Sequence, residues 1–365
     1  MRVMALFVMG DASPLTITET DNLMHVPYSP DPEVSTQPDP VTIHYHPLDV
    51  ELLVNNRFSV SVLVDNTMYS VWDMSLIRPG DERHLQWDFI DDVEHCACTA
   101  NNTWYVTTDG KIETLYTDPL YENHLSLPVA VDRVYCSPNN SVFVRTTEHN
   151  QLYALGPNRH GELGLGDTDS RVEFQLVPNV SNVKTVHAGA SHTCIVTRDN
   201  EYMFAGNNSH RQCLDVDEGR ILSFTRDERL DEVLHVCMLD TSTVYVVNNG
   251  SNDRFMMHGI WNGNEWPAGG FEVDSIVAVQ CTSTQCYFIC TTEQAQKLWS
   301  VSPSGEFLLW VDNIDVDEVM EPLHAGFDTL FVILGEVEYE EQFVYDEDNV
   351  THVAMGGSLF HSQQN

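Results

Sequence analysis

An internal repeat is the feature that most constrains the fold of this chain. Polar turn residues followed by a valine-rich or aromatic run recur at intervals of 38 to 52 residues, most often 44. Self-similarity with such a period indicates one supersecondary unit copied along the chain, whose neighbouring copies bury a common core. We count seven units, and they begin near residues 54, 98, 136, 188, 237, 281 and 325.

Each unit has the composition of several short strands. A Val-rich lead such as Val183–Val186 comes first, and a run such as Trp104–Val106 follows after polar turn residues. A turn rich in Gly, Asn and Asp then leads to an aromatic run such as Leu152–Leu155. Short strands and turns at this spacing are typical of blades of four-stranded sheet. We therefore expect an all-β, seven-bladed β-propeller that forms a single domain over residues 1–365.

The two ends of the chain complement each other in the repeat. Residues Leu6–Asp11 match the second half of a unit but have no first half before them, and the unpaired first half lies near Ala325. We expect residues 1–15 to supply a strand that completes the last blade and closes the ring, which protects sheet edges. The apolar stretch Val3–Gly10 is short for the alternative, a secretory signal peptide.

Two segments fall outside the repeat. Residues 21–47 contain six prolines and predict an extended loop between blades. Residues 336–365 begin with a run of carboxylates, and we expect this acidic segment to add a strand at most and to end in a frayed tail.

The unit that follows residue 151 has the most regular motif. It reads LYALGPNRHGELGLGD over Leu152–Asp167, and HAGASHT follows at His187–Thr193. This resembles the regulator of chromosome condensation (RCC) repeat, an aromatic-rich strand followed by Gly-x-Asn-x-x-Gly-x-Leu-Gly-x-Gly and later Ala-Gly-x-x-His-Thr. The resemblance is specific over residues 151–214 and implies the RCC type of β-propeller. The motif residues to which it gives a structural role are Gly156, Asn158, Gly161, Leu163, Gly164, Gly166, Gly189 and His192.

The glycines of this motif do not predict a phosphate site. We expect them in a loop between strands, where positive φ or close backbone approach excludes a Cβ. Neither a following helix nor a Gly-Lys-Ser/Thr sequence accompanies them. His192 stands beside Ser191, but neighbouring residues of a strand point to opposite faces. The resemblance implies that His192 forms a hydrogen bond within its own blade, and we predict no catalytic residue.

Net charge excludes one class of partner. Lys and Arg number 17 against 55 Asp and Glu, which gives a formal charge of −38. Nucleic-acid binding needs clustered basic residues, so direct binding of nucleic acid is not expected. No apolar run reaches 18 residues, so we expect no membrane-spanning helix.

The nine cysteines are odd in number and widely spread, which favours a reducing compartment, in the cytoplasm or the nucleus. Four of them align at one repeat position: Cys98, Cys136, Cys237 and Cys281. Because Ala fills this position in other units, the position requires a small buried residue rather than a metal ligand. Neither the Cys96-x-Cys98 pair nor His44-x-His46 has a second pair of ligands. We predict no metal and no cofactor.

Candidate partner-binding residues come from two places. Trp261 falls where other units have turn residues, and Trp266 follows closely. These tryptophans are candidates for exposed interface anchors, with packing against the neighbouring blade as the alternative. The carboxylates Asp315, Asp317 and Glu318 belong to an acidic cluster that attracts a basic partner.

Together these observations predict a non-catalytic propeller that binds a basic protein as a scaffold or regulatory subunit. The resemblance implies three kinds of partner: a small GTPase, a small zinc protein of diphthamide and tRNA modification, or a chromatin-acting oxygenase. The alternative, by analogy with the founding member of the family, is guanine-nucleotide exchange on a Ran-type GTPase.

Overall fold

The computed structural model describes residues 6–9, 18–20, 23–26, 41–44, 50–55, 59–72, 87–115, 127–230, 233–248, 252–267, 270–273, 275–281, 286–291, 296–314, 323–326, 329–333, 354–355 and 358–359. Their regular structure is β-strand, and none of these residues forms a helix that would span a membrane. They belong to two compact units. The central unit comprises residues 50–76 and 86–272, and the terminal unit comprises residues 1–49, 77–85 and 273–365.

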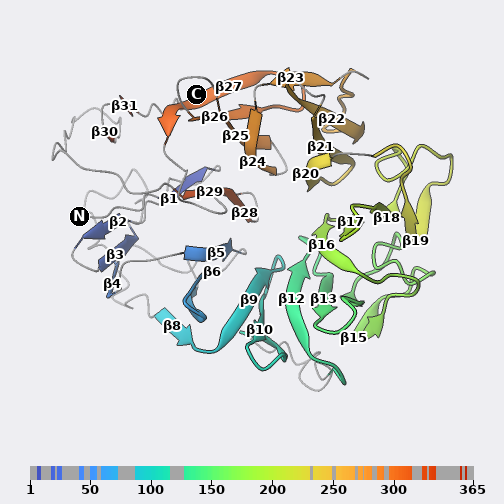
Figure 1. Ribbon diagram of the computed structural model, residues 1–365, viewed down its shortest axis with the longest axis horizontal. Helices are drawn as coiled ribbons and strands as arrows, with labels where there is room; N and C mark the ends of the chain where they lie inside the picture. Colours follow the sequence, from blue (N-terminus) through green and yellow to red (C-terminus); the bar gives the residue numbers. More distant parts are fainter. Residues whose placement is uncertain are drawn as a thin grey trace, which may run out of the picture. The chain divides into compact units, whose positions relative to one another are not determined.

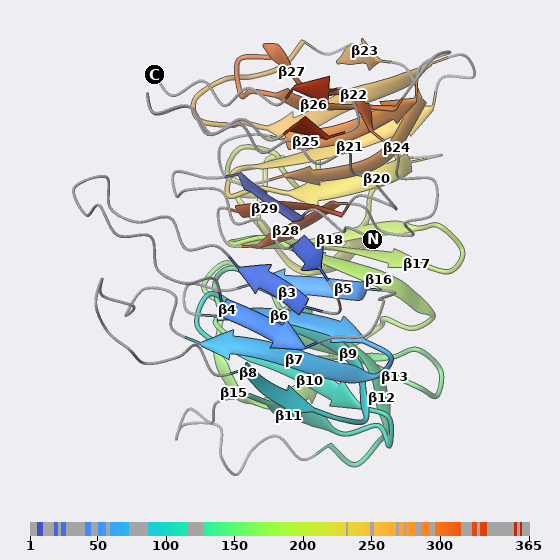
Figure 2. The same ribbon diagram turned by 90° about the vertical axis from the view of Figure 1, so that its left-hand side faces the viewer.

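The central unit contains successive antiparallel sheets, and Figure 1 shows their first strands β9, β12 and β16 next to one another. Figure 2 shows strands β6, β7 and β8 of the first sheet side by side. The first sheet has its strands in the order β5 (Val50–Asn55), β6 (Ser59–Val64), β7 (Thr67–Trp72) and β8 (Trp87–Ile90), and the second has β11 (Ile112–Thr114), β10 (Thr103–Thr107) and β9 (Val93–Cys98). The third sheet has β12 (Val131–Cys136), β13 (Val142–Thr146), β14 (Leu152–Gly156) and β15 (Arg171–Leu176), and the fourth has β16 (Val183–Ala188), β17 (His192–Thr197), β18 (Tyr202–Asn207) and β19 (Arg220–Arg226). The fifth sheet has β20 (Val233–Met238), β21 (Ser242–Asn248), β22 (Asp253–Gly259) and β23 (Phe271–Val273).

The terminal unit has one four-stranded sheet and three smaller ones among its described residues. They are β24 (Ser275–Cys281), β25 (Cys286–Thr291), β26 (Gln296–Val301) and β27 (Phe307–Ile314); β1 (Leu6–Met9), β29 (Thr329–Ile333) and β28 (Leu323–Gly326); β2 (Thr18–Thr20), β3 (Leu23–Val26) and β4 (Val41–His44); and β30 (Ala354–Met355) with β31 (Ser358–Leu359).

The sequence repeat coincides with the first strand of each sheet. Strands β9, β12, β16 and β24 end at Cys98, Cys136, Ala188 and Cys281, the residues that marked the units. Cys237 breaks the alignment, because Met238 ends β20 and pairs with Thr243 where Ala188 pairs with Thr193. The prediction that Cys237 occupies the common position is therefore wrong by one residue.

Middle strands are buried on both faces. All the side chains of β13 and β17 are buried, so both strands are enclosed by neighbouring sheets. One apolar cluster joins Phe143 and Leu152 of the third sheet to Val186 and Ile195 of the fourth. Strands enclosed in this way need apolar residues at successive positions rather than in alternation. This is why the runs around residues 142–146 and 192–197 carry almost no charge.

The loop over residues 157–170 fastens the third sheet to the fourth. Its Leu165 forms an isolated bridge with Ser223 on β19, and the N–H of Gly166 donates to the Leu222 carbonyl at 2.9 Å. Gly164 has φ +69°, and a Cβ added to it would lie 2.3 Å from the Phe224 ring. The motif glycine thus serves close packing between two sheets.

Comparison with the sequence expectations confirms an all-β protein with several four-stranded sheets. Strand β1 pairs with β29, with Leu6 opposite Ile333, so the N-terminal run lies in a sheet. The number of seven blades and the closure of the ring stay predictions. The proline-rich segment is not only a loop, because β3 and β4 pair within it.

We expect Gly164→Ala to lower the free energy of unfolding by about 2–4 kcal/mol, since it combines left-handed backbone strain with overpacking against Phe224. Urea denaturation measures the effect. Two other glycines separate the causes: Gly263 has φ +81° and Gly219 has no positive φ, and an added Cβ meets no atom within 4 Å at either. Gly263→Ala should cost about 1–2 kcal/mol and Gly219→Ala less than about 0.5 kcal/mol. Equal losses at Gly164 and Gly263 would contradict the packing role.

Candidate functional site

Polar side chains hold the loops that follow β14 of the third sheet and β18 of the fourth. Strands β14 and β18 each end in a loop of the same design, over residues 157–170 and 207–219. The predicted motif residues fall at these places: Gly156 ends β14, Asn158, Gly161, Leu163, Gly164 and Gly166 lie in the first loop, Gly189 follows β16, and His192 begins β17.

A buried asparagine holds each loop. The Oδ1 of Asn158 accepts the N–H of Leu163 at 2.9 Å, and its Nδ2 donates to the Asp167 carbonyl at 3.0 Å. Asn208 repeats the arrangement, since its Oδ1 accepts the N–H of Cys213 at 3.0 Å and its Nδ2 donates to the Glu218 carbonyl at 2.9 Å. One side chain therefore satisfies both the early and the late part of each loop.

His192 bonds outside its own sheet, which corrects the sequence expectation. Its Nε2 lies 2.9 Å from the Thr243 hydroxyl on β21, the second strand of the next sheet. Ser191 is engaged elsewhere, because its hydroxyl donates to the Asp240 carbonyl at 2.8 Å. A similar contact between sheets joins the hydroxyls of Ser59 and Thr103 at 3.3 Å. Side chains at this position connect sheets, and His192 and Ser191 do not form a nucleophile and base.

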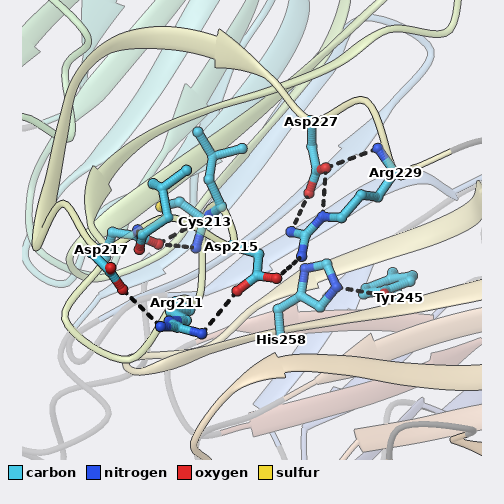
Figure 3. A network of polar contacts seen from close by, with 11 residues as sticks. Arg211, Cys213, Asp215, Asp217, Asp227, Arg229, Tyr245 and His258 are labelled. Carbon is cyan, nitrogen blue, oxygen red and sulfur yellow. Dashed lines mark hydrogen bonds and ion pairs between the residues drawn. The ribbon is translucent and has the colours of Figure 1, made fainter.

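Ion pairs fix the second loop, as Figure 3 shows. The Arg211 guanidinium lies 3.0 Å from the carboxylate of Asp215 and 2.7 Å from that of Asp217. Asp215 also lies 3.6 Å from Arg229, which follows β19. Asp217 is almost fully exposed, with 93% of its side chain accessible. We call Arg211, Asp215, Asp217, Asp227 and Arg229 the ionic network.

The buried end of the ionic network is the pair of Asp227 and Arg229. Two guanidinium nitrogens of Arg229 donate to Asp227 at 2.9 and 2.7 Å. Burial raises the pKa of Asp227, but the hydrogen bonds from Arg229 outweigh it and hold that pKa below its usual value. Beside this pair, the Tyr245 hydroxyl lies 2.7 Å from His258 Nε2. Burial, aided by the Arg229 charge, lowers the pKa of His258 to about 4.

Burial shifts the pKa values of several histidines and cysteines in the described part of the central unit. Burial lowers the pKa of His95 and His192 to about 3, and that of His187 to about 4. Burial also raises the pKa of the Cys96 and Cys194 thiols well above its usual value. A general base needs a pKa near the working pH and a nucleophilic cysteine needs a lowered one. The pKa values of these histidines lie well below a neutral working pH, and those of the two thiols are raised rather than lowered.

The two predicted tryptophan anchors are buried. Trp261 is 2% exposed and Trp266 9%. Their rings lie 5.9 Å apart, and Trp266 also meets the rings of Phe255 and Phe271 edge-on. Trp261 stands at the repeat position of Asn158 and Asn208. An apolar ring therefore replaces the amide group that holds the loop in the two preceding units. These ring contacts are with β22 and β23 of the fifth sheet, so packing against the neighbouring blade stays a prediction. The acidic candidates Asp315, Asp317 and Glu318 lie outside the described residues.

The cysteines and the other possible metal ligands form a disulfide but no metal cluster among the described residues. Among the described residues, no group of three or more His, Cys, Asp or Glu side chains has the geometry to hold a metal ion. Cys281 and Cys286 form a disulfide across β24 and β25, a pairing that the sequence analysis did not anticipate. The sequence offered no sign of this pairing or of the ionic network, whose members are separated by up to 18 residues and follow no motif.

We expect Asp227→Asn to lower the free energy of unfolding by about 1–2 kcal/mol near pH 7, because it removes the buried charge that accepts two hydrogen bonds from the Arg229 guanidinium and leaves only the longer contact with Asp215. The lowered pKa of Asp227 means that its contribution is present above the usual carboxyl value of 3.8 and is lost as the pH falls through the folded-state pKa. The difference between wild type and variant should therefore shrink in acid. Urea titrations near pH 7 and at about pH 3 measure it.

Asp217→Asn is the matched control, because it removes an ion pair of the same network that is exposed to solvent. We expect it to change the free energy of unfolding by less than about 0.5 kcal/mol. A loss at Asp217 as large as that at Asp227 would show that burial does not set the strength of these pairs.

Comparisons with known proteins agree on one family. The family model for the regulator of chromosome condensation (RCC1) repeat matches residues 149–196. The chain is 32% identical to the X-linked retinitis pigmentosa GTPase regulator of Canis lupus familiaris over 120 residues, which are 32% of this chain and 10% of that protein. It is 26% identical to an RCC1 repeat-containing protein of Dictyostelium discoideum over 173 residues, 45% of this chain and 32% of that one.

Solved structures show the same fold. Yeast RCC1 (Prp20), in its complex with Kap60, has a TM-score of 0.62 at 11% identity, with 92% of this chain and 90% of that chain covered. Human WBSCR16 has a TM-score of 0.61 at 13% identity, with 92% and 100% covered. The chain spans about a tenth of the length of the GTPase regulator, and its similarity to RCC1-repeat proteins is carried by the repeat matched at residues 149–196.

Proposed function

We propose that the chain is a non-catalytic RCC1-type propeller that binds a basic protein as a scaffold or regulatory subunit. The observation that carries the proposal is the formal charge of −38, with only 17 Lys and Arg. A field of this sign raises the rate of encounter with basic surfaces and opposes acidic ones.

The described part of the molecule supports a binding role over a catalytic one. Its buried histidines are neutral at physiological pH, and its buried thiols are protonated. By contrast, the loop over residues 207–219 is rigidly held by Asn208 and Arg211 and presents the exposed carboxylate of Asp217. Rigid loops on a scaffold are a common means of recognising a partner. We assign this loop to the partner-binding surface.

Guanine-nucleotide exchange on a Ran-type GTPase is the second candidate. It is favoured by the similarity to a protein named as a GTPase regulator, and by the fold shared with Prp20p of Saccharomyces cerevisiae, whose structure was reported with its binding properties to Gsp1p and histones. A small zinc protein of tRNA modification and a chromatin-acting oxygenase are further partner classes that stay predictions, as does a place in the cytoplasm or the nucleus.

The test is retention of partners from a cell lysate on the tagged chain, with GDP and Mg²⁺ in one arm and with a Mg²⁺ chelator in the other. A basic protein held equally in both arms, and released by salt because exposed charges are screened, is the expected result. A small GTPase held only in the chelator arm would overturn the scaffold and support exchange. Release of fluorescent GDP from that GTPase, with and without the chain, would then measure the activity directly.

Two single-charge variants locate the surface. Asp217 and Asp199 are both exposed, but Asp199 lies in the turn between β17 and β18, at the opposite end of β18 from the loop over residues 207–219. We expect Asp217→Asn to weaken retention of the basic partner by about threefold or more and Asp199→Asn to leave it nearly unchanged. Equal effects would show that only the overall charge matters and that the loop is not the surface.

A further inference from the structure

The disulfide between Cys281 and Cys286 is a chemical feature that the proposed function does not use. Cys281 ends β24 and Cys286 begins β25, and the two residues lie opposite each other in the register of this hairpin. Both strands belong to the four-stranded sheet of the terminal unit. The disulfide therefore joins two residues that main-chain pairing already brings together.

Other sheets form the same hairpin without a covalent link. Cys281 and Cys286 are separated by five positions in the sequence, and register partners with the same separation join the first and second strands of three other sheets. These partners are Cys98 with Thr103, Ala188 with Thr193, and Met238 with Thr243. Cys98 Sγ and Thr103 Oγ1 lie at hydrogen-bond distance, 3.2 Å apart. The shape of the hairpin thus does not require a disulfide, and a disulfide that closes a short loop stabilises a fold less than one that closes a long loop.

The two cysteines differ in their exposure to solvent. Cys281 is partly exposed, whereas Cys286 is fully buried. Thiol–disulfide exchange begins when a thiolate attacks one sulfur of the disulfide, and its rate depends on access to that sulfur. A small thiol therefore reaches the disulfide at Cys281.

Buried cysteines of the central unit are unsuited to this chemistry. Burial raises the pKa of the Cys96, Cys136 and Cys194 thiols well above its usual value. Such thiols stay protonated and unreactive, because the thiolate is the nucleophile. These three cysteines therefore do not compete with the Cys281–Cys286 pair for exchange.

We propose that Cys281 and Cys286 form a reversible redox site, which a small thiol of the glutathione type reduces and the corresponding disulfide re-oxidises. Disulfides in reducing compartments are usually transient and serve catalysis or redox sensing. The redox role thus rests on the predicted place of the chain in the cytoplasm or the nucleus. It does not depend on which partner the chain binds.

The reaction is a two-electron exchange. A glutathione thiolate attacks Cys281 Sγ and forms a mixed disulfide there, while the electron pair of the broken S–S bond passes to Cys286 Sγ, which takes up a proton. A second glutathione thiolate then attacks the glutathione sulfur of the mixed disulfide. Glutathione disulfide leaves, and Cys281 Sγ takes up the other proton. The reverse sequence closes the bond again.

Equilibration of the native, full-length chain in glutathione buffers tests the proposal. The buffers range from an excess of glutathione disulfide to a large excess of glutathione, and free thiols are then alkylated and mapped by mass spectrometry. We expect Cys281 and Cys286 to be linked in the oxidising buffers, and the linked fraction to fall by about tenfold or more in the reducing ones while the protein stays folded. A pair that stays linked until the protein unfolds would be a structural disulfide, and a pair that is unlinked in every buffer would be no redox site. Either result would overturn the proposal.

A double variant that copies the fourth sheet provides the matched control. Cys281→Ala combined with Cys286→Thr places the side chains of Ala188 and Thr193 at the corresponding positions of β24 and β25. We expect this variant to fold, to melt at the same temperature in oxidising and reducing buffers, and to melt within roughly 3 °C of the reduced wild type. Unfolding of the wild type on reduction, or failure of the double variant to fold, would show that the disulfide is structural and would contradict the proposal.

Discussion

The packing of one sheet against the next is the interaction on which the rest of the central unit depends. Strands β13 and β17 have no face left for solvent, so each sheet is stable only when its neighbours are in place. The apolar cluster that joins Phe143 to Ile195 also includes Leu163 of the intervening loop. Loops and strands are therefore parts of one core, and a loop change is transmitted to two sheets. This explains why loop residues such as Asn158 and Gly164 are as constrained as core residues.

The sequence predicted the features that recur and missed those that occur once. Repeated strand composition identified the all-β fold and the ends of β9, β12, β16 and β24, because each sheet must meet the same packing requirement. The glycine-rich loop was also recognised, since positive φ leaves a compositional mark. The contact of Gly164 with Phe224 was not, because it depends on the distance between two sheets, which no local pattern encodes.

Where single residues were misjudged, the cause was a partner from another strand. His192 bonds to Thr243 because the start of β17 faces the next sheet, and residue 192 gives no sign of which sheet that will be. Trp261 resembles an exposed loop residue in sequence, yet the tight turn at Asn262 and Gly263 leaves its ring among other aromatics. The disulfide of Cys281 and Cys286 joins residues in direct register, which became visible only with the pairing of β24 and β25.

Charge serves two separate purposes in this molecule. Nine of the 17 basic residues fall between residues 145 and 229, together with twelve acidic ones. The carboxylates in the described loops of this segment therefore have basic side chains nearby with which to form ion pairs. Arg211 and Arg229 bind aspartates within the chain, and the negative excess lies mostly in the remaining sequence. A field spread over the whole chain accelerates encounter but selects no particular site, because it acts at long range and is screened by salt. Under the proposed function, selectivity requires groups with fixed positions, and the ionic network contains such groups, because Arg211 holds the exposed Asp217 and the buried Asp227 holds Arg229.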